Sequence, residues 1–317
     1  MQEVVDHYNG MERTLQFENF DIETKLGKTI FHADDTIGDH YHKEMLRRIF
    51  KYGHLDHNPR PHYSDGTPAH TISINGSMHQ YDLSKNQLPI ITLRPIAIKS
   101  AIGEMLWIYQ DQSNDLDLLK EKYNVTWWDS WDIGNRTIGQ VYGATVKRYN
   151  LVNNLIKDIK ENPDGRRHIM SLWQVKDFEE PHGLKPCAFL TVWNVHHAED
   201  GNDYLDMSLN IRSSDYSVAG VLNQMQYVVL QHLIARECGY KPGLFTCFFS
   251  NIQIYDRHID NAIELCSRNG IQCMPKLWIN PEKTNFYDFT IDDIKLVDYP
   301  REEISRKNPQ LKFDLGI

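Results

Sequence analysis

The residues with the clearest capacity for chemistry are a single thiol and the arginines that could activate it. Cys187 stands near the entrance of a strand-like run, residues 184–193, in which β-branched and aromatic residues follow the thiol. A thiol attacks as the thiolate, so it needs nearby positive charge to lower a pKa of about 8.5. Arg166, Arg167 and Arg212 could supply that charge. Cys187 is therefore a candidate nucleophile, although a lone cysteine among apolar residues is also typical of an inert core thiol.

A carboxylate on a predicted core helix is the second candidate. Apolar residues recur at helical spacing over residues 98–110, and Glu104 borders the stripe that they form. Burying a carboxylate is costly unless it is paired or functional, which favours Glu104 as a general acid or base. The alternative is a glutamate at the edge of the stripe whose carboxylate reaches solvent.

Three arginines could bind a phosphate group. Arg60 lies between Pro59 and Pro61, and a stiff loop of this kind could present a guanidinium fork to a phosphate or carry ordinary surface charge. Arg166 and Arg167 lead into a predicted strand, where neighbouring side chains point to opposite faces. Both would reach one phosphate only if the backbone kinks or a partner chain receives them. Otherwise they are two solvated charges.

An unusual aromatic cluster, Trp127, Trp128 and Trp131, lies between the second and third predicted helices. Indole faces could stack on a planar heterocycle, but such a cluster is also typical of core packing. Tyr142 and Gly143 follow, and this stretch does not fit the dinucleotide fingerprint GxGxxG.

Composition narrows the classes of function. The chain has 317 residues and a net charge of -9, which argues against a protein that wraps nucleic-acid phosphates and favours a small partner. Its five cysteines include no CxxC pair, so neither a disulfide framework nor a zinc ribbon is expected. The acidic and histidine-containing segment at residues 32–42 matches no metal motif, so we expect no metal. The sequence shows neither a pattern typical of an export signal nor one typical of a membrane span, so we expect a cytoplasmic protein.

The elements that must position these residues alternate between helix and strand. We expect one catalytic domain, residues 39–317, after a polar extension, residues 1–38, because no repeat or linker divides the chain. Predicted helices cover residues 41–51, 98–110, 152–160 and 223–236. Predicted strands cover residues 71–74, 88–93, 168–173, 184–193, 205–212, 245–254 and 273–280.

Several ordered motifs give the chain a specific resemblance. The chain resembles the folate-dependent thymidylate synthases at Pro186-Cys187, at the run Arg212-Ser213-Ser214-Asp215 and at Asn223. Further matches run from about residue 41 to the C-terminus. The resemblance implies an α/β (α+β) fold with a large mixed sheet, surrounding helices and a homodimer that packs sheet to sheet. It also implies dUMP and 5,10-methylenetetrahydrofolate as substrates, dTMP and dihydrofolate as products, and no metal.

By this resemblance, the Cys187 thiolate would add to carbon 6 of the uracil ring, which makes carbon 5 nucleophilic toward the methylene group of the folate. Asn223 would pair with the uracil edge, since an amide offers the donor and the acceptor that an imide requires. Glu104 would organise water for proton transfers, and Tyr142 would assist proton removal from carbon 5.

The remaining implied roles concern the phosphate, the sugar and the folate. Arg60 and Arg212 would hold the phosphate from one subunit, while Arg166 and Arg167 reach in from the other. The resemblance implies further contacts by Ser213 with the phosphate, by Gln253 and Tyr255 with the sugar, and by Asp215 and Trp128 with the folate. It also implies that the C-terminal carboxylate of Ile317 helps to close the site.

Some positions depart from the familiar family pattern. Ala188 follows the thiol where a histidine is usual, and Gln253 replaces a sugar-binding histidine. Gly66 stands at a usual phosphate arginine, for which Arg60 is the substitute. These departures indicate a divergent bacterial or phage-like branch.

Two alternatives stay open. A pyrimidine-nucleotide hydroxymethylase of the same superfamily would capture the methylene group with water. Asn223 favours uracil over cytosine, because a cytosine-reading relative is expected to carry a carboxylate there, and Trp128 favours hydride transfer. A non-catalytic nucleotide-binding protein is the second alternative, and it predicts loss of Cys187 or Glu104, both of which are present.

Overall fold

The computed structural model describes residues 16–17, 20–21 and 32–317. Its centre is a six-stranded sheet in the order β3-β4-β8-β7-β6-β5. Strands β7 and β8 run parallel and the other neighbouring pairs are antiparallel, which confirms the predicted mixed sheet. The strands are β3 (His54–Leu55), β4 (Thr71–Asp82), β5 (His168–Ser171), β6 (Ala188–His197), β7 (Asp203–Asp215) and β8 (Lys241–Tyr255).

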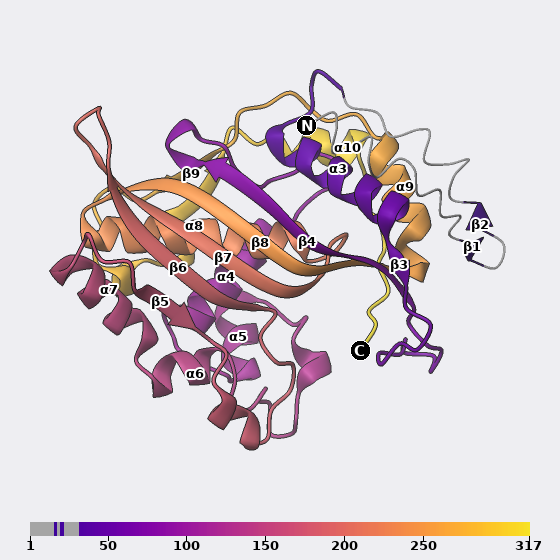
Figure 1. Cartoon of the computed structure of the whole chain (residues 1–317), viewed down its shortest axis with the longest axis horizontal. Helices are drawn as coiled ribbons and strands as arrows, with labels where there is room; N and C mark the ends of the chain where they lie inside the picture. The colour runs from indigo at the N-terminus through magenta and orange to yellow at the C-terminus, as the bar shows by residue number, and fades with distance from the viewer. Residues whose placement is uncertain (1–15, 18–19, 22–31) are drawn as a thin grey trace.

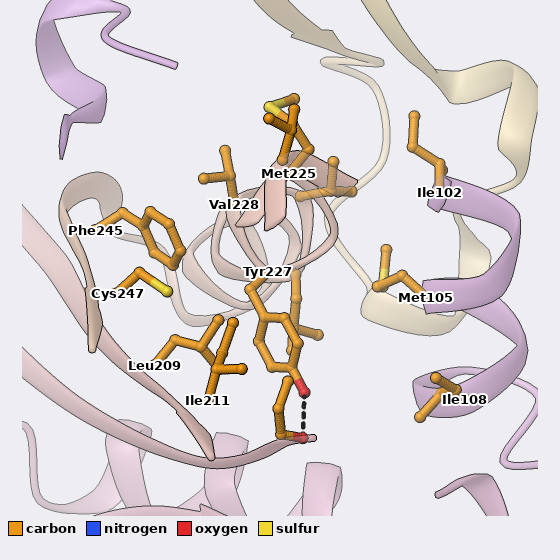
Figure 2. Close-up of a cluster of buried hydrophobic side chains, with 14 of the residues drawn as sticks. Ile102, Met105, Ile108, Leu209, Ile211, Met225, Tyr227, Val228, Phe245 and Cys247 are labelled. Atoms are coloured by element: carbon orange, nitrogen blue, oxygen red, sulfur yellow. Dashed lines mark hydrogen bonds between the residues drawn. The ribbon is translucent and has the colours of Figure 1, made fainter. Parts of the chain in front are cut away.

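Helix α8 (Gly220–Cys238) is the crossover between the parallel strands β7 and β8, which such a pair requires. It packs against α4 (Ile98–Tyr109) behind the sheet (Figure 1). Figure 2 shows the core that results, in which apolar side chains of α4 and α8 face those of β7 and β8. The residues labelled there are Ile102, Met105 and Ile108 on α4, Met225, Tyr227 and Val228 on α8, and Leu209, Ile211, Phe245 and Cys247 on the strands.

The other helices lie around the margins of the sheet (Figure 1). Helix α3 begins at Ile37, earlier than predicted, because Thr36 and Asp39 form a capping box. The remaining elements are α5 (Leu116–Tyr123), α6 (Gly143–Arg148), α7 (Leu151–Glu161), α9 (Ile259–Ser267), α10 (Arg301–Lys307), the paired strands β9 (Lys276–Ile279) and β10 (Ile294–Val297), the short strands β1 (Gln16–Phe17) and β2 (Phe20–Asp21), and 3-10 turns that include η2 (Asp129–Trp131) and η4 (Asp256–His258).

The strand predicted at residues 88–93 is wrong. This segment is buried but pairs with no strand among the described residues, and side chains from distant elements bond its backbone instead. Thr36 donates to the carbonyl of Ile90, and Tyr299 donates to the carbonyl of Ile91. These bonds satisfy polar groups that would otherwise require a ladder, so an apolar run that is typical of a strand lies in the core as a loop.

Most of the predicted extension, residues 1–38, lies outside the described part of the chain, so the division at residue 38 stays a prediction. Among the described residues, no helix has the length and apolar character that crossing a membrane requires. In the same part of the chain, no group of three or more His, Cys, Asp or Glu side chains is arranged to hold a metal ion.

Candidate active site

Cys187 lies immediately before β6, and its side chain is partly exposed. Arg212 on β7 reaches back to it, with Nη2 3.7 Å from the Cys187 Sγ. The same guanidinium donates to the carbonyls of Pro186 and Lys185, each over 2.8 Å, which fixes it against the segment that carries the thiol. Burial raises the pKa of the Cys187 thiol, and the charge of Arg212 opposes that rise. Arg212 is thus the one predicted activating arginine that contacts the thiol in the described chain.

Two tyrosines hold the backbone beside the thiol. The amide of Cys187 donates to the Tyr142 hydroxyl over 3.3 Å, and the Tyr227 hydroxyl donates to the carbonyl of Ala188 over 3.2 Å, as the dashed line in Figure 2 shows. Tyr142 has a φ of 51°, in the left-handed region that costs energy for a residue with a side chain. A Cβ on Gly143 would lie 2.0 Å from the Ser113 carbonyl oxygen, so the turn requires glycine there.

Glu104 is buried, which excludes the predicted alternative of a carboxylate at the solvent edge. Trp127 donates its indole N–H to Oε2 of Glu104 over 2.5 Å. Burial raises the pKa of Glu104 to about 7, against the amide of Gln226 and the indole N–H of Trp127, which lower it. A carboxyl group with this pKa can both accept and release a proton near neutral pH.

Asn223 lies in the first turn of α8, which begins at Gly220 rather than at Asn223 as predicted. Its amide Nδ2 donates to Oε1 of Gln226 over 3.1 Å. Gln226 is also one of the polar groups that lower the pKa of Glu104, so its amide acts on both residues.

The ends of β7 and β8 bring four predicted residues together. Asp215 lies opposite Gln253 in the parallel register, and the Ser213 hydroxyl lies 3.3 Å from Oε1 of Gln253. Tyr255 ends β8, and burial raises the pKa of its hydroxyl to about 12. The charges of Asp215 and Cys187 add to that rise and the charge of Arg60 opposes it, which places Tyr255 within electrostatic reach of all three.

Asp215 has two basic neighbours that are not among the residues predicted from the sequence. His258 Nδ1 lies 3.6 Å from Asp215 Oδ2, and the charge of Asp215 acts on the buried guanidinium of Arg94. Burial lowers the pKa of Arg94 to about 10, and Asp215 opposes that fall. Asp215 Oδ1 is buried and has no hydrogen-bond partner among the described residues. Neither Arg94 nor His258 lies in a pattern that indicated this role.

The C-terminal tail lies beside the loop that carries Arg60. Ile317 and His62 exchange two backbone hydrogen bonds, each 2.9 Å long. Arg257 joins the same two segments, since its guanidinium bridges Asp65 on the loop and Asp314 on the tail. Arg257 is likewise not among the site residues predicted from the sequence.

Arg166 and Arg167 lie far from the thiol of their own chain. Both are exposed, and both precede β5, in which His168 lies opposite Trp193 of β6. At about 3.3 Å per residue along β6, this register puts the arginine pair about 20 Å from Cys187. They cannot lower the pKa of the thiol in their own chain, so that part of the prediction is wrong.

Trp128 is buried within the aromatic cluster. Its ring packs edge-on against Tyr142 at 4.8 Å and against Trp131 at 5.4 Å. Core packing, the alternative interpretation of this cluster, therefore describes Trp128, and the predicted contact with folate stays a prediction.

Comparison with known proteins identifies the family. Residues 40–309 match the family model described as thymidylate synthase. The chain belongs to the thymidylate synthase family. The thymidylate synthases of Streptococcus sanguinis (strain SK36) and Streptococcus pneumoniae (strain 70585) are each 49% identical to it over 284 residues, which is 89% of this chain and 100% of each relative. The solved structure of thermostable thymidylate synthase A from Bacillus subtilis matches with a TM-score of 0.79 and 35% identity, over 88% of this chain and 99% of that one.

These matches confirm the resemblance found in the sequence, the fold class and the activity. The chain is a methyltransferase of the thymidylate synthase type, which methylates dUMP to dTMP. Its carbon donor and reductant is the co-substrate 5,10-methylenetetrahydrofolate.

Proposed function

We propose that Cys187 is the nucleophile of this thymidylate synthase and that its thiolate adds to carbon 6 of the uracil ring of dUMP. The observation that carries the proposal is the contact of Arg212 Nη2 with the Cys187 Sγ at 3.7 Å. A guanidinium at this distance favours the thiolate, the form that attacks. The new carbon–sulfur bond moves electrons onto the ring, and carbon 5 then attacks the methylene carbon supplied by the folate.

Glu104, Asn223 and Tyr142 act on the pyrimidine in this proposal. Glu104 organises the water that carries protons at oxygen 4 and carbon 5, and its pKa of about 7 suits both directions of transfer. The amide of Asn223 pairs with the uracil edge, where negative charge develops as the thiolate adds. Tyr142, fixed by the amide of Cys187, assists the removal of the proton from carbon 5.

The other predicted residues bind the phosphate, the sugar and the folate. Arg60 and Arg212 bind the phosphate with Ser213, and Gln253 and Tyr255 bind the sugar. Asp215 accepts a hydrogen bond from the folate, and its buried Oδ1, which has no partner among the described residues, suits such a donor. Trp128 lines the folate site, and the Ile317 carboxylate closes over it, which keeps water from the reactive methylene group.

The proposal includes a homodimer whose sites are shared. Arg166 and Arg167 are exposed and lie about 20 Å along the sheet from their own Cys187, so they suit the phosphate of a partner's site. The near face of β7 and β8 carries no helix of the described chain in Figure 1. Exposed apolar residues lie on the same sheet. Met78 and Phe248 are register partners there, 51% and 40% exposed, as a face buried between two subunits requires.

We further propose that residues 39–317 form the single catalytic domain and that the enzyme works in the cytoplasm. The family model matches residues 40–309, which supports this domain boundary. None of the five cysteines forms a disulfide in the described part of the chain, and a reducing compartment suits such thiols.

The nucleophile is tested by quenching the enzyme with acid during turnover of dUMP and methylenetetrahydrofolate, then mapping its peptides by mass. The peptide that contains Cys187 should carry the mass of the nucleotide, and the peptide that contains Cys247, a buried thiol, should not. A nucleotide on another cysteine, or full turnover by Cys187→Ser, contradicts the assignment.

The shared site is tested by mixing two inactive variants, Cys187→Ala and the double variant Arg166→Ala with Arg167→Ala. In a mixed dimer, one site combines an intact thiol with an intact arginine pair, so activity should return after subunit exchange. If the mixture stays as inactive as its parents, the arginines do not serve the partner.

A further inference from the structure

We infer that Gln226 is a positioning residue that fixes which end of the Asn223 amide faces the pyrimidine, and so helps the enzyme to select uracil over cytosine. The inference rests on the proposed role of Asn223. It concerns a side chain that the sequence motifs did not single out and that touches no substrate.

The orientation of Gln226 is set by helix α4. Gln226 is 5% exposed, and its Nε2 donates to the backbone carbonyl of Ala101 over 3.3 Å. Glu104 lies one turn further along the same helix, and Gln226 is one of the polar groups that lower the pKa of its carboxyl group. A carbonyl can only accept, so the bond to Ala101 requires the N–H end of the Gln226 amide. A rotated amide would place its oxygen against the Ala101 carbonyl oxygen in a buried site, which is costly.

With Nε2 held by α4, the oxygen of Gln226 faces Asn223. Oε1 accepts from Nδ2 of Asn223 over 3.1 Å, so the N–H end of the Asn223 amide is the end beside Gln226. Nδ2 carries two hydrogens, and this bond uses one of them. Asn223 therefore keeps one N–H donor and the acceptor Oδ1 for other partners. The positions of this donor and this acceptor are fixed by the bond to Gln226.

These two free groups match one pyrimidine better than the other. The uracil edge offers a donor at nitrogen 3 and an acceptor at oxygen 4, which an amide with a free acceptor and a free donor can pair in one orientation. The cytosine edge offers an acceptor at nitrogen 3 and a donor amino group at carbon 4. Pairing cytosine requires the reversed amide, which would place Oδ1 of Asn223 against Oε1 of Gln226, two acceptors with no proton between them.

The test measures binding of dUMP and of dCMP to the full-length enzyme by calorimetry, without folate, for three variants. Gln226→Met keeps the length and burial of the side chain and removes the amide. Gln224→Met is the matched control, because Gln224 is also buried on α8 and uses its amide on Gly220 and His79, away from Asn223. Asn223→Ala tests the role on which the inference rests.

Loss of one orienting hydrogen bond should weaken dUMP binding by Gln226→Met about tenfold and change dCMP binding by no more than about twofold. The ratio of the two affinities should therefore fall, whereas Gln224→Met should keep the wild-type ratio. Thermal unfolding shows whether each variant is folded. If Gln226→Met does not fold, the same binding measurements are made with Gln226→Leu.

The inference is overturned if Gln226→Met keeps the wild-type ratio or weakens both nucleotides equally, since a merely structural role predicts no change in discrimination. If Asn223→Ala lowers the ratio and Gln226→Met does not, only the inference fails. If Asn223→Ala itself leaves the ratio unchanged, the proposed role of Asn223 fails, and the inference fails with it.

Discussion

Trp127 donates its indole N–H to the carboxylate of Glu104 over 2.5 Å, from the turn that precedes η2 to the buried face of α4. The bond stabilises the ionised carboxylate in a place where burial favours the protonated form. The pKa of Glu104, about 7, is the balance of these two effects. A change to the donor should therefore change the pH at which the enzyme works.

The first prediction concerns Trp127→Phe. Loss of the indole donor should raise the pKa of Glu104 by about one unit, because a hydrogen bond to a charged group contributes about 1.5 kcal/mol or more. Activity that needs the ionised carboxylate is lost as the pH falls through this pKa, so the acid limb of the kcat profile should move to higher pH. Trp131→Phe is the control, and equal profiles for the two variants would contradict the prediction.

The second prediction concerns the charge beside the thiol. Arg212→Met removes the guanidinium that opposes the raised pKa of Cys187, so that pKa should rise further, by about one unit. Below the pKa, the thiolate fraction should fall about tenfold, and the rate of alkylation by iodoacetamide should fall with it. Peptide mapping follows Cys187 and the partly buried Cys273 in one sample. An equal loss of rate at both cysteines would indicate a general change in structure.

Much of the fold could be predicted from the sequence because its longest elements have strong periodicity. The stripe of α4 and the buried strand β8 are of this kind. Residues 88–93 have the composition of a strand, but their hydrogen-bond partners come from Thr36 and Tyr299, which no local pattern reveals. The sequence shows which segments are buried more reliably than it shows what pairs with them.

The candidate site likewise contains residues that could be predicted from the sequence and residues that could not. Cys187, Glu104 and Arg212 stand in patterns whose chemistry can be stated from the residue types, and the structure brings Arg212 to the thiol. Trp127 was noted only as part of the aromatic cluster and Gln226 not at all, because their roles depend on hydrogen bonds to α4 from other elements. Such partners become visible only when the packing of α4 against its neighbours is known.

The third prediction concerns stability in acid. Burial lowers the pKa of His42 to about 3, from 6.5 for the free side chain, and neither ring nitrogen has a hydrogen-bond partner among the described residues. Between these pH values the unfolded chain binds a proton that the folded chain does not, so the free energy of unfolding falls as the pH drops below 6.5. One unit below that value, the loss from this histidine is about 1.4 kcal/mol.

His42→Phe should remove that loss and keep the stacking on Tyr216. The variant should therefore lose less stability than the wild type when chemical unfolding is compared at pH 7 and pH 5.5. His57→Gln, at an exposed position, should behave like the wild type. Parallel losses in all three proteins would show that His42 does not titrate on unfolding.

The fourth prediction concerns the C-terminal tail. A Cβ on Gly316 would lie 2.7 Å from Cε1 of Tyr255 and 2.9 Å from Cβ of Ala69, so Gly316→Ala should push the tail away. An overpacking cost of about 1.4 kcal/mol should raise the KM for methylenetetrahydrofolate about tenfold. Binding of dUMP should weaken by less than this, because Tyr255, whose ring the new Cβ would contact, is only one of several groups proposed to hold that nucleotide. Leu315→Ala, at a residue 41% exposed, is the control, and an equal KM for both variants would exclude close packing of the tail as the cause.

The most direct measurement is a product analysis of the purified enzyme with dUMP and methylenetetrahydrofolate, with the nucleotide identified by mass and dihydrofolate by absorbance. We expect dTMP and dihydrofolate in equal amounts from the wild type and neither from Cys187→Ala. Hydroxymethyl-dUMP with tetrahydrofolate would mean that water rather than hydride captures the methylene group. Production of dTMP by Cys187→Ala would contradict the central role of this thiol.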